Sequence, residues 1–272
     1  MPRLVLIGDD SLEKILEVKE VTKKYKNGRG VENISFDINK GDIYGFLGPN
    51  GAGKTTLMKI ITGLSKADKG EIKIFGYNLT NDFEKAMEKV GAMVEDAVVY
   101  EYMSAYNNLK LAARFYPNVN KKDIEGILEL VGLSEFKEEK VSDFSLGMKQ
   151  RLSLASALLA SPEFVILDEP TNGLDIEGVV EIRNTIKNLA KSKKISFIVS
   201  SHQIHEIELI CNRVGIIYNG KLIREGQVSD ILNNNQESLE DFFIRQLNEN
   251  RMSVTVDNCK VQDEEYEELN DW

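Results

Sequence analysis

Cysteine is scarce in this sequence, and long apolar runs are absent. The 272 residues include two cysteines, Cys211 and Cys259, whose spacing fits no metal-binding motif and whose number supports no disulfide framework. No stretch approaches the roughly 20 consecutive apolar residues of a membrane-spanning helix. The apolar run Leu4–Ile7 is too short, and too closely followed by acidic residues, for a secretory signal. We therefore expect a protein of the reducing cytoplasm.

Positive charge is also in short supply. The chain has 34 lysines and arginines against 44 acidic residues, a net charge of −10. This balance argues against nucleic acid as a partner, because phosphate backbones attract basic surfaces. Residues 257–272 alone hold seven acidic side chains and one lysine. Acidic segments with few large apolar residues remain solvated, so we expect a disordered acidic tail over 257–272.

One glycine-rich stretch fits the pattern G-x-x-x-x-G-K-[ST], the phosphate-binding P-loop. An apolar strand at 42–47 precedes it, and apolar residues at helical spacing follow it over 57–64. Glycines let successive backbone N–H groups turn inward around an anion, and the helix N-terminus adds its positive dipole end. The stretch therefore predicts a nucleotide site formed by Gly48, Pro49, Asn50, Gly51, Ala52, Gly53, Lys54, Thr55 and Thr56.

The apolar pattern of the whole chain predicts an α/β fold. Alternating segments over 16–38 indicate an antiparallel β layer ahead of the nucleotide-binding core. A continuous apolar run at 164–167 indicates a central parallel strand that is covered on both faces, and residues 195–199 read as another buried strand. Helical spacing dominates residues 104–160. We expect a P-loop core with a mostly parallel sheet, an N-terminal antiparallel layer and an inserted all-helical subdomain.

Polar residues with suitable chemistry follow the buried strands. Lys54 is expected to reach the β- and γ-phosphates, and the Thr55 hydroxyl to ligate Mg²⁺. Asp168 ends an apolar strand where P-loop proteins place a second magnesium contact, and Glu169 can hold the attacking water as a general base. Adjacent strand residues point to opposite faces, so both acids can serve only if the chain bends there. The alternative is that the two acids simply mark the point where the strand ends in solvent.

Two further side chains are candidates by position. His202 ends the next buried strand, on the side where open parallel sheets bind ligands. A contact with the γ-phosphate is favoured there over a purely structural role. Tyr25 lies in the loop between the first two strands, where an aromatic ring can stack on an adenine. A half-exposed tyrosine at a strand end explains Tyr25 equally well.

The order of these motifs resembles that of the ATP-binding cassette (ABC) ATPases, the motor subunits of ABC transporters. Residues 48–56 resemble the Walker A motif, and 165–169 resemble the Walker B strand with its catalytic glutamate. The resemblance implies ATP and Mg²⁺ as cofactors and an adenine-stacking role for Tyr25. It implies catalytic roles for Glu169, His202 and Lys54, and metal contacts from Thr55, Asp168 and Glu95.

Residues 144–148, Phe-Ser-Leu-Gly-Met, resemble the signature of this family, usually written L-S-G-G-Q. Ser145 and Gly147 keep the hydroxyl and the bare amide that suit a phosphate at a helix N-terminus. An ordinary serine cap of the next helix is a compatible interpretation. In this family the signature of one subunit closes over ATP held by another. The resemblance thus implies a head-to-tail dimer with trans contacts from Ser145, Leu146, Gly147, Met148 and the D-loop residue Asp175.

Glu95 departs from the family pattern, which commonly has glutamine at the end of this strand. Together with the Ser-Leu-Gly-Met signature, it resembles the branch that exports antimicrobial peptides or confers immunity to lantibiotics and bacitracin-type antibiotics. A carboxylate near the γ-phosphate alters magnesium affinity or hydrolysis rate. An equivalent oxygen ligand without functional consequence is the alternative.

The resemblance covers residues 16–226, with the helical subdomain at about 97–160. Residues 1–15 are expected to be an N-terminal extension, and 227–256 a C-terminal extension that packs on the core or contacts a partner. The implied partners are a separate polytopic permease and a second ATPase subunit, identical or homologous. The implied location is the cytoplasmic face of the cell membrane. The alternative is an ABC ATPase that acts in translation, DNA or iron–sulfur assembly, whose usual linkers, coiled coils and zinc sites are absent from the sequence.

Overall fold

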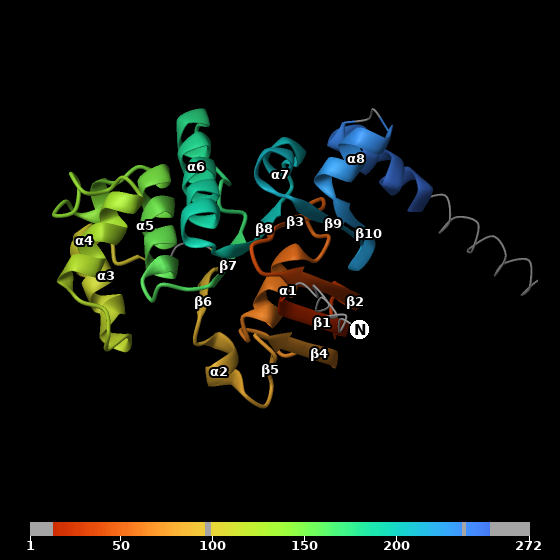
Figure 1. Cartoon of the computed structure of the whole chain (residues 1–272), viewed down its shortest axis with the longest axis horizontal. Coiled ribbons are helices and arrows are strands. Elements are labelled where there is room, and N and C mark those ends of the chain that lie inside the picture. Colours follow the sequence, from red (N-terminus) through yellow and green to blue (C-terminus); the bar gives the residue numbers. More distant parts are fainter. Residues whose placement is uncertain (1–12, 96–98, 236–237, 251–272) are drawn as a thin grey trace, which may run out of the picture.

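The computed structural model describes residues 13–95, 99–235 and 238–250. Most of the expected N-terminal extension and all of the expected acidic tail, which includes Cys259, lie outside these ranges. The described chain forms two sheets and a helical lobe (Figure 1). Among the described residues, no helix has both the length and the apolar character needed to span a bilayer.

The larger sheet has six strands in the order β10-β9-β3-β8-β7-β6. Its members pair in parallel except for the antiparallel hairpin of β9 and β10. The strand β7 is buried along its whole length, as its continuous apolar sequence predicts. The strands are β3 (Ile43–Leu47), β6 (Val90–Met93), β7 (Phe164–Asp168), β8 (Ser196–Ser201), β9 (Arg213–Tyr218) and β10 (Lys221–Gln227).

The smaller sheet is the antiparallel layer expected from the N-terminal alternation. Its order is β2-β1-β4-β5, with β1 (Lys14–Lys24), β2 (Gly30–Asn39), β4 (Lys69–Ile74) and β5 (Tyr77–Asn78). Helix α1 (Lys54–Ile61) shares one hydrophobic cluster with both sheets, through Leu57 and Met58 against Ile34 of β2 and Phe46 of β3. This packing fixes the helix that follows the P-loop between two layers.

A helical lobe is inserted between β6 and β7 (Figure 1). Its own hydrophobic cluster includes Leu109, Leu128 and Leu152, one from each of its three α-helices. The fold class predicted from the sequence is thereby confirmed. The helices are α3 (Ala105–Ala112), α4 (Lys121–Leu130) and α5 (Leu146–Leu158), with short 3₁₀ turns at Ala113–Phe115 and Val141–Asp143; the short α2 (Phe83–Met87) precedes β6.

The face of the large sheet opposite α1 is covered by α6 (Ile176–Lys193), α7 (Ile204–Ile210) and the C-terminal region (Figure 1). Helix α8 (Val228–Asn235) and helical residues 239–250 belong to that region. Leu239 and Phe242 are buried in the same cluster as Phe197 and Val199 of β8. Of the two interpretations open for 227–250, this packing supports attachment to the core.

Candidate nucleotide-binding site

The P-loop connects β3 to α1 and places its amides at the start of that helix. Gly51 and Gly53 have φ angles of 81° and 111°, values that side chains with a Cβ rarely adopt. Gly53 is also the N-cap residue of α1 and, as a glycine, has no side chain that could accept hydrogen bonds from the first turn of this helix. Its unpaired N–H groups and positive dipole end are therefore available to a phosphate.

Lys54 is held inside this loop by two kinds of oxygen. Its ammonium donates to the Gly48 carbonyl at 2.7 Å and lies 3.1 Å from Glu169 Oε1. The side chain is only 5% exposed. A lysine this deeply buried requires a partner for its charge, and Glu169 supplies that partner across the site.

Asp168 and Ser200 form the buried floor of the site. The Ser200 hydroxyl donates to Asp168 Oδ1 at 2.5 Å and accepts from the Glu169 amide at 3.0 Å. Burial raises the pKa of the Asp168 carboxyl, while hydrogen bonds from the hydroxyls of Ser200 and Thr55 oppose this rise. The sequence had pointed to Asp168 but not to Ser200, whose position on the neighbouring strand β8 brings it beside Asp168.

Glu169 meets the requirement for a bend at the end of β7. Its φ of 50° is in the left-handed region, which breaks the strand alternation immediately after Asp168. The Glu169 carboxylate then lies between two cationic or donor groups, with Lys54 at Oε1 and His202 Nδ1 at 2.8 Å from Oε2. A carboxylate can only accept, so Nδ1 of His202 carries the proton of this hydrogen bond.

These groups meet in a pocket of about 340 Å³. It contains much of the predicted P-loop set together with Glu169 and His202. Three lining residues were not predicted: Arg29 at the end of the loop after Tyr25, Gly30 at the start of β2, and Asn172, whose amide donates to the Glu169 carbonyl at 3.1 Å. The sequence feature that could have predicted them is their closeness to Tyr25 and Glu169. The lining residues are Arg29, Gly30, Asn50, Gly51, Gly53, Lys54, Thr55, Thr56, Glu169, Asn172 and His202.

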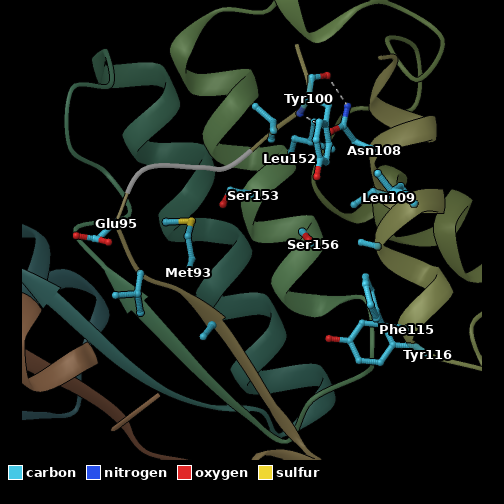
Figure 2. A pocket seen from close by; sticks show the side chains of 15 residues that line it. Met93, Glu95, Tyr100, Asn108, Leu109, Phe115, Tyr116, Leu152, Ser153 and Ser156 are labelled. Atoms are coloured by element: carbon cyan, nitrogen blue, oxygen red, sulfur yellow. Dashed lines mark hydrogen bonds between the residues drawn. The ribbon is translucent and has the colours of Figure 1, made fainter. Parts of the chain in front are cut away.

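Several predicted residues lie outside this lining, among them Tyr25 and Glu95. Tyr25 is 38% exposed, with its hydroxyl 3.4 Å from Ser65 Oγ. Glu95 has a φ of 66° and is paired with Lys59 of α1. It lines a different pocket, between β6 and the helical lobe (Figure 2). The roles of both residues toward nucleotide and metal stay predictions.

The signature and D-loop residues begin helices outside the pocket lining. Ser145 caps α5, its hydroxyl accepting from the Met148 amide at 3.2 Å, as the serine-cap interpretation expected. Asp175 caps α6 and accepts from the Gly178 amide at 2.9 Å. Leu146 is 51% exposed. Within one chain, these residues and the P-loop pocket are thus separate surfaces.

The donors present fit a magnesium ion held mainly by phosphate oxygens. Among the described residues, no cluster of three or more histidine, cysteine or acidic side chains can hold a metal alone. Mg²⁺ in nucleotide sites uses one or two protein oxygens plus phosphates and water. The Thr55 hydroxyl in the pocket and the buried Asp168 carboxylate provide that chemistry.

Comparison with known proteins identifies the family. A sequence profile described as ABC transporter matches residues 31–172. The chain belongs to the ABC transporter family. It is 42% identical to the bacitracin transport ATP-binding protein BcrA of Bacillus licheniformis, over 84% of this chain and 75% of that protein. It is 37% identical to the lantibiotic transport ATP-binding protein SrtF of Streptococcus pyogenes, over 86% of this chain and 97% of that protein.

A solved structure gives the same assignment. The dimeric structure of the ATP-binding cassette MJ0796, in a post-hydrolysis state bound to ADP and Pi, superposes with a TM-score of 0.71. The two chains are 25% identical, and the match covers 79% of this chain and 99% of that one. This ABC chain is therefore an ATP-binding protein and an ATPase, which hydrolyses ATP to ADP and phosphate.

Proposed function

We propose that this chain is the motor subunit of an ABC exporter for peptide or antibiotic-like substrates, acting on a separate membrane permease. The observation that carries the ATPase part is the contact network of Lys54, Glu169 and His202 at the P-loop. The bacitracin and lantibiotic transport relatives support the exporter class. Glu95 and the Ser-Leu-Gly-Met signature, the features that suggested this branch, support it independently.

The network suggests how the site responds to ATP. Lys54 lies 3.1 Å from Glu169 Oε1, and a triphosphate at the P-loop gives its ammonium a more highly charged partner. Glu169 Oε1 is then released to accept a proton from the attacking water as general base. His202, bound to the other carboxylate oxygen at 2.8 Å, keeps Glu169 oriented and approaches the γ-phosphate.

Magnesium chemistry is assigned to two side chains of this site. The Thr55 hydroxyl and the Asp168 carboxylate would hold Mg²⁺, which supplies neutralisation of phosphate charge when bound. Ser200 fixes Asp168 through its hydroxyl. In this way Asp168 is already oriented before the nucleotide arrives.

The proposed working unit is a head-to-tail dimer. Ser145 and Gly147 lie outside the P-loop pocket of their own chain, so a second subunit is needed to bring them to the γ-phosphate. Leu146 of the signature is 51% exposed, and Ile176, next to the D-loop residue Asp175, is 86% exposed. Exposed apolar side chains at these helix starts suit a surface that closes on another subunit.

The pocket between β6 and the helical lobe is the proposed docking site of the permease. It measures about 420 Å³ and is lined by apolar and aromatic side chains together with four polar residues, Glu95, Asn108, Ser153 and Ser156. Figure 2 shows Glu95 at one end and Phe115 with Tyr116 at the other. Phe115 is 83% exposed. Glu95 belongs both to this pocket and to the chain segment expected to sense Mg²⁺, which suits coupling between transport and hydrolysis.

Affinity purification of the tagged chain from detergent-solubilised cells tests the transport assignment. The proposal expects recovery of a polytopic membrane protein. Recovery of ribosomes, DNA or iron–sulfur proteins in its place would support the alternative of an ABC ATPase outside transport. The location at the cytoplasmic face of the membrane is tested together with it, because the permease is the proposed attachment point.

A further inference from the structure

The cations of the P-loop pocket are not equivalent. One arginine and one lysine, Arg29 and Lys54, are among the described residues that line it. Lys54 is neutralised by Glu169 at 3.1 Å. The guanidinium of Arg29 is exposed and has no ion-pair or hydrogen-bond partner among the described residues. ATP brings several negative charges into this pocket, and Arg29 is the cation there that no protein carboxylate already engages.

The backbone that carries Arg29 is fixed in position. The Tyr25 amide donates to the Arg29 carbonyl at 2.8 Å, and the Gly28 amide donates to the Tyr25 carbonyl at 2.9 Å. Gly30 follows with a φ of 145°, and a Cβ at this position would lie 1.8 Å from the Lys23 carbonyl oxygen. These contacts hold the tight turn at both ends, so the backbone position of Arg29, from which its side chain extends, is fixed.

The same turn rests directly on the P-loop. A Cβ on Gly53 would lie 2.9 Å from the Gly30 carbonyl oxygen, and one on Gly220 would lie 2.7 Å from it. Gly220 belongs to the turn between β9 and β10, and its carbonyl accepts from the Glu32 amide at 2.8 Å. Arg29 consequently enters the pocket beside the N-terminus of α1, from the β9–β10 side.

The hydrolytic residues approach from the other side. In the sheet order β10-β9-β3-β8-β7-β6, β3 and its P-loop separate β9 from β8 and β7. Glu169 follows β7 and His202 follows β8. The γ-phosphate must lie near these two residues, so the half of the triphosphate on the Arg29 side is the half nearer the nucleoside.

We propose that Arg29 is a nucleotide-binding residue that contacts the α- and β-phosphates of ATP. Its planar guanidinium presents paired N–H donors that match phosphate oxygens. It shares its turn with Tyr25, the expected adenine-stacking residue, so one short loop would hold the nucleoside half of the ligand. Because the α- and β-phosphates are common to both nucleotides, Arg29 stabilises bound ATP and bound ADP alike.

The test compares full-length Arg29→Ala, Arg29→Lys and Lys26→Ala with the wild-type chain. Lys26→Ala removes a charge from the same turn, at a side chain outside the pocket lining, and is the matched control. Titration calorimetry measures the Kd of ADP and of a slowly hydrolysed ATP analogue, and steady-state hydrolysis gives KM and kcat. Circular dichroism verifies folding, and Arg29→Gln is the second variant if Arg29→Ala does not fold.

For Arg29→Ala we expect both Kd values and KM to rise about tenfold, the loss of one charge-assisted phosphate contact. The kcat at saturating ATP should change less than twofold, Arg29→Lys should fall between, and Lys26→Ala should match wild type. Unchanged Kd values would overturn the proposal. A loss of affinity confined to the ATP analogue would overturn the placement at the α- and β-phosphates. An equal loss of affinity in Lys26→Ala would overturn the proposal as well, because the effect would then come from the overall charge of the turn and not from a contact of Arg29.

Discussion

Replacing Ser200 with alanine removes a hydroxyl that holds two functional residues at once. This fully buried side chain donates to Asp168 Oδ1 at 2.5 Å and accepts from the Glu169 amide at 3.0 Å. Without it, the buried Asp168 carboxylate loses its β8 donor. The Glu169 amide keeps a 3.2 Å contact with the Ser200 carbonyl. The expected damage is therefore concentrated on Asp168.

The size of the effect follows from that contact. Hydrogen bonds to charged groups contribute about 1.5–3 kcal/mol to the free energy of unfolding. We expect Ser200→Ala to lower it by about 2 kcal/mol, equivalent to a Tm decrease of about 4–8 °C for a chain of this size. Thermal unfolding followed by circular dichroism measures this change. Because Asp168 is then no longer held in its orientation, a higher Mg²⁺ concentration should be needed to reach the half-maximal rate of ATP hydrolysis. Measuring that rate against Mg²⁺ concentration shows this change.

Ser196→Ala is the matched control for this variant. Ser196 is equally buried on the same strand, but its hydroxyl accepts from the neutral Gly41 amide at 2.7 Å. We expect it to cost about 1 kcal/mol and to leave the Mg²⁺ requirement unchanged. If Ser200→Ala unfolded within 1 °C of wild type, or if both variants raised the Mg²⁺ requirement equally, the assigned role of Ser200 would be wrong.

Two further variants test the pocket between β6 and the helical lobe. Glu95→Gln removes an exposed ion pair with Lys59, so the free energy of unfolding should change by less than about 0.5 kcal/mol and ATP binding should persist. The rate of ATP hydrolysis or of transport by the reconstituted complex should change. Unchanged rates in both assays would contradict the role of Glu95. Phe115→Asp should reduce co-purification of the permease without loss of ATP binding. Tyr77→Asp, at an exposed aromatic residue on β5, is its control, and equal recovery with both variants would refute docking at Phe115.

Much of the fold could be predicted because local patterns were strong. The buried strand β7 reads as a continuous apolar run, and the P-loop carries its own strand-to-helix context. The bend at Glu169 was required by strand alternation, and its positive φ of 50° meets that requirement. These features depend on residues that are close in sequence, where spacing carries most of the information.

Contacts between distant segments were less accessible. Ser200 acts on Asp168 from a neighbouring strand, 32 residues away in sequence, and nothing in its own surroundings marks it. Arg29 reaches the pocket because Gly30 packs against Gly53. Glu95 forms an ion pair with Lys59 of α1, and this pair depends on α1 lying close to the end of β6. Tertiary arrangement decides all three placements.

The central claim is that the P-loop pocket is half of an ATP site and that the signature of a second subunit completes it. Glu169→Gln retains the P-loop but loses the proposed base, so it should bind ATP and hydrolyse it very slowly. Light scattering after size-exclusion chromatography is the most direct measurement. With ATP, Glu169→Gln should shift from the 30.7 kDa of one chain to twice that mass, and the added change Ser145→Arg should prevent the shift. A Glu169→Gln chain that stays monomeric with ATP bound, or that dimerises equally with Ser145→Arg, would contradict the claim.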